Sequence, residues 1–197
     1  MSEIENHVIP TPAGRSGKQA TLASVARTGQ ILTFVLIQST VLVACIFLFM
    51  TLREQQAEVP GPIPGAETAG EQDVVLPIAG TVLTLGAAIA SLIVPMMQRK
   101  AAAVRYRDLG ERVRLPINPD AILTPGLTQY VAVWQSSALV GQAMLEGAAI
   151  MNLVLMHIDG HRLHLAFAGA CIIGITLHTP FVGRMHQAIE HLMTARE

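Results

Sequence analysis

Four long runs of apolar residues divide the chain. They cover residues 31–52, 74–97, 127–156 and 163–183, and each has the roughly 20 mostly apolar residues that a helix needs to cross a membrane. Three of the runs contain no Asp, Glu, Lys or Arg, and the third contains a single acid, Glu146. Helices of soluble proteins usually keep one polar face, which these runs lack. The pattern predicts an all-α bundle of four transmembrane helices.

The polar flanks of these runs predict the remaining organisation. Residues 1–29 form a polar N-terminal segment, residues 30–184 the membrane domain and residues 185–197 a C-terminal tail. The first apolar run begins only at Ile31 and is long enough to span, so it is interpreted as an uncleaved signal-anchor helix and not as a cleaved signal peptide.

The composition supports a membrane class. Charged residues make up 14% of the chain and hydrophobic residues 51%, whereas soluble domains carry roughly 25% charged residues. Nucleic-acid-binding domains usually carry a net positive charge, whereas this chain has a net charge of −1, so no nucleic-acid partner is expected. Cys45 and Cys171 lie inside apolar runs and form no CxxC motif, which predicts two small buried apolar residues.

Lysine and arginine are distributed unequally among the connecting segments. Eleven of the 13 lie in the N-terminal segment, between the second and third runs, or after the fourth run, and only Arg53 and Arg162 lie on the other side. Cytoplasmic segments carry the excess of positive charge. Tyr130 and Trp134 mark the inner interface of the third helix. The prediction is an inner-membrane protein with both termini in the cytoplasm.

The two long connecting segments differ in character. Residues 54–73, on the outer side, combine acids with prolines and predict a flexible acidic cap. Residues 99–114, on the inner side, form a basic stretch that is predicted to be helical. Two interpretations of this stretch stay open, which are contact with anionic lipid headgroups and docking of a cytosolic partner.

The chain also resembles a duplicated helical hairpin. Gln38-Ser39 matches Gln135-Ser136 at an offset of 97 residues, and Pro95 matches Pro180 at an offset of 85. A repeat of this kind would be parallel, as in some transporter folds. Apolar helices also match by chance, so both interpretations stay open.

Glu146 is the leading candidate for a functional residue. A carboxylate near the middle of a membrane helix costs a few kcal/mol when it is ionised, so Glu146 is expected to face the bundle interior and to be protonated or paired. Gln142 lies one turn away on the same helix face. These two residues are either a proton- or ion-carrying pair or hydrogen-bonding groups that join helices.

Four further polar residues lie at compatible depths and are supporting candidates: Gln38, Ser136, Ser137 and His178. His178 and Glu146 differ in depth by roughly 12 Å at the rise of an α-helix, so no direct pairing is expected. Interhelical hydrogen bonding also explains this set.

Small residues recur at helix-packing spacing in the last three runs. Examples are Gly86 with Ala90, Ala143 with Gly147, and Ala170 with Gly174. Small residues allow close approach of membrane helices. We therefore expect the second, third and fourth helices to form a tight core, the first to be peripheral, and the protein to associate with a second copy or another membrane protein.

Residues 157–164 contain three histidines and an aspartate, which are ligands that zinc or copper accepts. Arg162 opposes a cation there, so a solvated turn without metal is predicted. His186, Glu190 and His191 are interpreted as the polar face of an amphipathic helix. The sequence contains no nucleophile triad, phosphate loop or HExxH motif. No metal, cofactor or enzymatic activity is expected.

Residues 130–157, with Gly141, Gln142, Glu146 and Gly147, resemble the carboxylate-bearing helix of rotary ATP synthase subunit c, the proteolipid. The resemblance implies that Glu146 carries a proton or sodium ion and that Gln142 helps to position it. The second apolar run lacks the glycine ladder of that family, and the first and fourth runs are additional. A second likeness is to small multidrug-resistance transporters, which have four helices and one embedded glutamate, although in their first helix.

Two functions follow as expectations. The first is a non-enzymatic structural or accessory component of the membrane, because four spans occur without catalytic motifs. The alternative is proton- or ion-coupled translocation that uses Glu146.

Overall fold

The computed structural model describes residues 20–57, 72–111, 118–120 and 122–194. All regular elements of these residues are helices, which confirms the predicted all-α class. The helices are α1 (Leu22–Ala57), α2 (Gln72–Asp108), α3 (Pro125–Asp159), α4 (Leu163–Leu177) and α5 (Val182–Thr194). The predicted acidic cap lies largely outside the described residues, as does most of the polar N-terminal segment.

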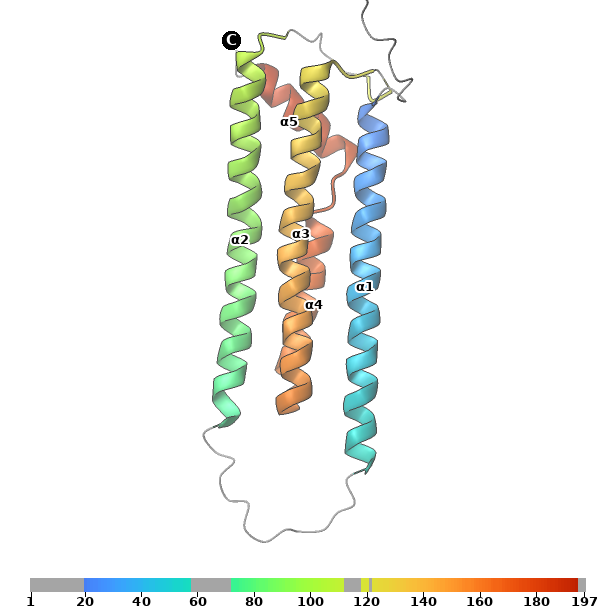
Figure 1. Cartoon of the computed structure of the whole chain (residues 1–197), viewed down its shortest axis with the longest axis vertical. Coiled ribbons are helices and arrows are strands. Elements are labelled where there is room, and N and C mark those ends of the chain that lie inside the picture. The colour runs from blue at the N-terminus through green and yellow to red at the C-terminus, as the bar shows by residue number, and fades with distance from the viewer. Residues whose placement is uncertain (1–19, 58–71, 112–117, 121, 195–197) are drawn as a thin grey trace, which may run out of the picture.

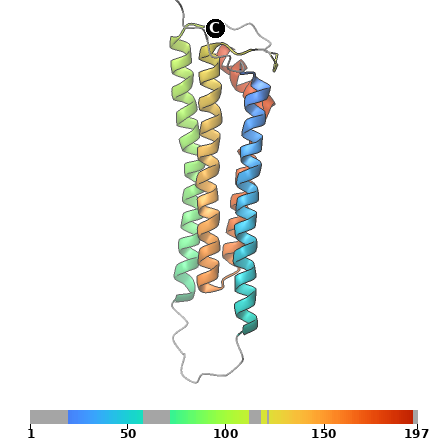
Figure 2. The ribbon, with the colours of Figure 1, turned by 45° about the vertical axis from the view of Figure 1, so that its right-hand side comes forward.

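The three long helices α1, α2 and α3 lie side by side, with α4 beside α3 (Figures 1 and 2). The short helix α5 lies at the end of the bundle where α1 begins. We call this end the inner end, after the predicted orientation, and the opposite end the outer end. Helix α3 contacts α1, α2 and α4, so it is the central helix. The sequence predicted a core of α2, α3 and α4 with α1 at its periphery. Helix α1 packs directly on α3, so it also belongs to the core.

Helix α3 has well-defined ends. Thr124 is the N-cap and its side chain accepts a hydrogen bond from the Leu127 N–H, while Pro125 occupies the first turn, where its missing N–H costs nothing. Gly160 ends the helix with φ 69°, a left-handed conformation that glycine adopts without strain. The helix therefore exceeds the predicted span 127–156 by two residues at its start and three at its end.

The fourth span is not the continuous helix that was predicted over residues 163–183. Helix α4 ends at Leu177, and α5 follows at an angle of 58°. Pro180 explains the break, because proline donates no helical hydrogen bond and disfavours helical geometry in the residue before it. Helix α2 continues through Pro95, which matches Pro180 in the predicted duplication. The duplication itself stays a prediction.

Helix α5 covers the inner end of the bundle and contains most of the predicted C-terminal tail. Met185, Ile189 and Leu192 are buried on one face, at the spacing of an amphipathic helix. They join an inner cluster that includes Leu22 of α1, Tyr106 of α2, and Leu127 and Trp134 of α3. The residues after the bend therefore belong to the folded structure.

The outer surfaces of α1 and α2 are apolar along most of their length. Phe34 and Phe49 of α1 are each 67% exposed, and Val82 and Leu92 of α2 are each 64% exposed. Cys45 is also exposed, so the prediction of a buried residue is wrong there, whereas Cys171 is buried as predicted. Contiguous exposed apolar area of this extent is unstable in water and typical of a membrane-facing surface.

Three of the helices are long and apolar enough to cross a membrane, or four if α4 and α5 are one bent span. At about 1.5 Å per residue, α4 alone is roughly 22 Å long, shorter than the ~30 Å hydrocarbon core. If α4 and α5 form one bent span, the residues of the break and the start of α5 provide the remaining length.

Candidate functional site: polar side chains of the central helix

Glu146 lies on α3 and is half-buried against α1. Its Oε1 is 2.7 Å from Ser39 Oγ, and the same Oγ is 2.8 Å from the Leu36 carbonyl oxygen. A serine hydroxyl has one hydrogen and donates to only one of these oxygens at a time. Ser39 Oγ therefore has two acceptors within reach, one on its own helix and one on α3, and its contact with Glu146 joins α1 to α3.

Gln142, one turn nearer the inner end, is completely buried. Its Nε2 donates to Thr33 Oγ1 at 2.8 Å and to the Ile175 carbonyl oxygen at 3.4 Å, so the amide joins α3 to α1 and α4. Its Oε1 has no hydrogen-bond partner among the described residues. An unpartnered buried oxygen is unusual, and a water molecule or an ion is a common reason for one.

The four supporting candidates divide into two groups. Ser137 is buried, donates to the Trp134 carbonyl at 2.7 Å and accepts from Arg99 Nε at 2.9 Å. Gln38 and Ser136 are exposed on the surface of the bundle, and Ser136 bonds only within its own helix, to Val133. Of these three, only Ser137 joins two helices.

His178 is the C-cap residue of α4 and bridges to α2. Its Nδ1 is 2.8 Å from the Gly174 carbonyl oxygen and its Nε2 is 3.1 Å from the Ser91 carbonyl oxygen. Both neighbours are carbonyl oxygens, so the imidazole lies between an acceptor on its own helix and an acceptor on α2. The partners of His178 and Glu146 are different residues, as the difference in depth predicts.

A buried polar network lies near the outer end, where the sequence indicated a solvated turn. His164 is completely buried, with Nδ1 3.1 Å from Asn152 Oδ1 and Nε2 2.8 Å from Asp159 Oδ2. The interpretation as a solvated turn is therefore wrong for His164, although His161 and Arg162 are exposed. The available signal was the spacing of His164 with the buried apolar positions of α4, which places it on the inward face.

Asn152 extends this network to α2. Its Nδ2 donates to Thr84 Oγ1 at 3.0 Å and to the Ala148 carbonyl oxygen at 2.9 Å, which leaves Oδ1 facing His164. Gly80 provides the space on α2, because a Cβ at that position would lie 2.6 Å from both Asn152 Oδ1 and His164 Nδ1. The network of His164, Asn152, Asp159 and Thr84 thus links three helices, and we call it the outer network.

Metal binding finds no support in the geometry of the described residues. They contain no group of three or more His, Cys, Asp or Glu side chains arranged to hold an ion. His164 and Asp159 pair with each other, and His161 is exposed on the turn. His186 Nδ1 lies 3.6 Å from Glu190 Oε1 on α5, an i,i+4 pair of an ordinary amphipathic face.

Taken together, four buried or half-buried polar side chains of α3 form hydrogen bonds that reach α1, α2 and α4. Ser137 and Asn152 bond to α2, Gln142 and Glu146 bond to α1, and Asn152 also contacts His164 of α4. Such bonds hold membrane helices together, and a protonatable carboxyl group among them can also exchange a proton.

No protein-family model, curated protein or solved structure matches this chain.

Proposed function

We propose that the chain is a non-enzymatic component of the inner membrane that crosses the bilayer four times, with both termini in the cytoplasm. The main support is the use of polar groups in α3, because the contacts of Ser137, Gln142, Glu146 and Asn152 all reach neighbouring helices. The exposed apolar surfaces of α1 and α2 support membrane insertion. The excess of Lys and Arg at the inner end supports the orientation.

The role of Glu146 tests this proposal. If Glu146 only joins helices, Glu146→Gln should leave stability almost unchanged, because the amide keeps the shape of the side chain and its oxygen still accepts from Ser39. Glu146→Leu should lower the free energy of unfolding by about 0.6–2 kcal/mol, the range for an interhelical hydrogen bond in membranes. The measurement is unfolding of the purified protein in mild detergent.

The adjacent residues Ser39 and Gln38 give a matched pair of controls. Ser39→Ala removes the partner of Glu146 and should cost as much as Glu146→Leu, whereas Gln38→Ala removes an exposed side chain and should cost nothing. Equal effects of the two alanine variants would argue against a specific bond between α1 and α3.

A second candidate function is proton- or ion-coupled translocation with Glu146 as the carrier. Two observations favour it, namely the half-buried carboxyl group of Glu146 on the central helix and the unpartnered oxygen of Gln142 one turn away. Wild-type protein in vesicles would then conduct protons or sodium under an imposed gradient, and Glu146→Gln would abolish the flux because an amide cannot release a proton. Absence of flux from wild-type vesicles would remove this candidate.

Association with a second copy or another membrane protein stays a prediction. Gly86 of α2 and Gly147 of α3 line a groove of about 510 Å³ in which a Cβ at either glycine would meet nothing within 4 Å. Cross-linking in native membranes should yield a defined oligomer or heterocomplex. A strictly monomeric species in membranes and in mild detergent would contradict the prediction.

A further inference from the structure

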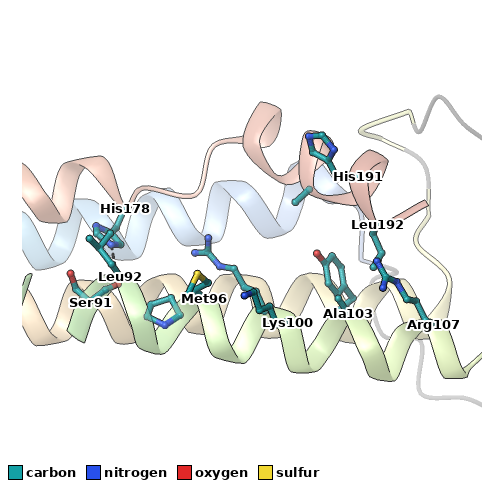
Figure 3. A pocket seen from close by; sticks show the side chains of 13 residues that line it. Ser91, Leu92, Met96, Lys100, Ala103, Arg107, His178, His191 and Leu192 are labelled. Atoms are coloured by element: carbon teal, nitrogen blue, oxygen red, sulfur yellow. Dashed lines mark hydrogen bonds between the residues drawn. The ribbon is translucent and has the colours of Figure 1, made fainter. Parts of the chain in front are cut away.

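A pocket of about 360 Å³ opens at the inner end between α2, α3 and α5. Figure 3 shows Lys100 and Arg107 of α2 together with His191 and Leu192 of α5 around it, and His178 with Ser91 at its far end. We propose that this pocket binds the headgroup of an anionic phospholipid. The proposal rests on membrane insertion as proposed above and names one ligand class for the basic inner end.

The charge of the pocket has one sign. Its lining residues include three permanent cations, Arg99, Lys100 and Arg107, and two histidines, and none of them is acidic. Tyr130 adds a phenol hydroxyl to the lining. Basic pockets between membrane helices on the cytoplasmic side are suited to lipid phosphates, because the low-dielectric surroundings strengthen the attraction to the anion.

Arg99 is held in position before any ligand arrives. Its guanidinium carbon lies 4.2 Å from the centre of the Trp134 ring, and its Nε donates to Ser137 Oγ at 2.9 Å. The hydrogen bond uses one of the five N–H donors of the side chain. A planar guanidinium that is fixed in this way can bind two phosphate oxygens at once.

The apolar part of the lining argues for a lipid and against free phosphate. Leu92, Pro95 and Met96 line the pocket on the side that leads towards the middle of α2. Leu92 is 64% exposed and Met96 49% exposed, and they continue the apolar outer surface of α2. A phospholipid can place its phosphate against the basic residues of the pocket and its acyl chain against the apolar residues. Inorganic phosphate would contact only the basic residues.

The test is lipid retention by the full-length protein in mild detergent, measured by native mass spectrometry with equimolar dioleoyl phosphatidylglycerol and phosphatidylcholine. Wild-type protein should retain phosphatidylglycerol in preference to phosphatidylcholine. Each cation removed should weaken retention about fivefold, so Lys100→Gln should lose about fivefold and Arg99→Gln with Lys100→Gln about 25-fold. Equal retention of the two lipids by the wild type would overturn the proposal.

Arg105→Gln is the matched control, because Arg105 is an exposed cation of the same helix that does not line this pocket. It should retain phosphatidylglycerol as the wild type does. If Arg105→Gln lost as much lipid as Lys100→Gln, general surface charge would explain the effect and the proposed lipid site would be refuted. Millimolar inorganic phosphate should not displace the lipid, and displacement would overturn the assignment to a lipid.

Two readouts separate failure of this proposal from other failures. Lys100 is exposed, so Lys100→Gln should fold normally. In a Cys45→Ala background, protection of the buried Cys171 thiol from a maleimide verifies the fold of each variant. Membrane crossing and orientation are measured independently by cysteine labelling. Correct crossing without lipid preference would refute the lipid site alone.

Discussion

Replacing Gly80 by alanine is expected to lower the free energy of unfolding by about 1–3 kcal/mol, the usual cost of an overpacked core. The added Cβ would lie 2.6 Å from both Asn152 Oδ1 and His164 Nδ1, so these side chains must move and their hydrogen bonds must lengthen. Alanine stabilises a helix by up to about 1 kcal/mol relative to glycine. A lower free energy of unfolding in Gly80→Ala would therefore mean that the steric clash costs more than this gain in helix propensity.

Gly86→Ala is the control for this prediction. Gly86 lies on the same helix, but a Cβ there meets nothing within 4 Å, so the substitution should be neutral or stabilising. The readout is the reactivity of the Cys171 thiol, which is buried in the outer half of the bundle, in a Cys45→Ala background. A destabilisation of 1–3 kcal/mol raises its exposure by about 5- to 150-fold. Equal behaviour of the two alanine variants would refute the packing of Gly80 against the outer network.

Replacing His164 by alanine should cost about 1–3 kcal/mol, the scale for leaving a buried hydrogen-bonding group without its partner. The substitution leaves the Asp159 carboxylate, whose side chain is 11% exposed, without its contact at 2.8 Å. It also leaves Asn152 Oδ1 without its contact to the imidazole. Thermal unfolding in mild detergent measures the loss, and His161→Ala, which removes an exposed histidine of the same turn, should have almost no effect.

The two substitutions should also interact. Because His164 is one of the two groups that a Cβ at Gly80 would meet, His164→Ala frees the space and should make Gly80→Ala much less costly. Neighbouring sites of this kind are not additive. Additive effects in the double variant would contradict direct contact between these positions.

The helices were predictable from the sequence because uninterrupted apolar runs leave few alternatives. Their ends were less so. The basic stretch 99–114 is helical as predicted, but only to Asp108, where α2 ends. It is helical beyond the predicted span because Lys, Arg and Ala are good helix formers outside the lipid as well. Hydropathy marks the thickness of the membrane and not the length of the helix.

The break after α4 shows a second limit. The sequence contains Pro77, Pro95 and Pro180, but only Pro180 follows the end of a helix. Pro95 is buried on α2 and lies near Gly141 of α3, where a Cβ would be 3.2 Å from its ring, so packing favours an unbroken helix there. Such packing depends on the pairing of helices far apart in the sequence.

Only part of the candidate site was predictable, because its contacts also depend on how distant helices pair. The depth and helix face of Glu146 and Gln142 follow from periodicity. Their partners Ser39 and Thr33 depend on the register between α1 and α3, which no local pattern contains. Gln38 and Ser39 are adjacent and equally polar, and only the register decides that Ser39 faces the interior while Gln38 is exposed. His164 was missed because its turn was interpreted apart from the helix that follows.

Cysteine accessibility tests the central claim, a four-span bundle with its inner end in the cytoplasm. The His161→Cys, Asp120→Cys and Gln187→Cys variants place single thiols at exposed positions, in a background with Cys45→Ala and Cys171→Ala. In intact cells an impermeant maleimide should label His161→Cys only, and after permeabilisation it should label all three. Labelling of Gln187→Cys but not Asp120→Cys in intact cells would show that the bent α4–α5 pair does not cross the membrane. Labelling of Asp120→Cys in intact cells would contradict the proposed orientation.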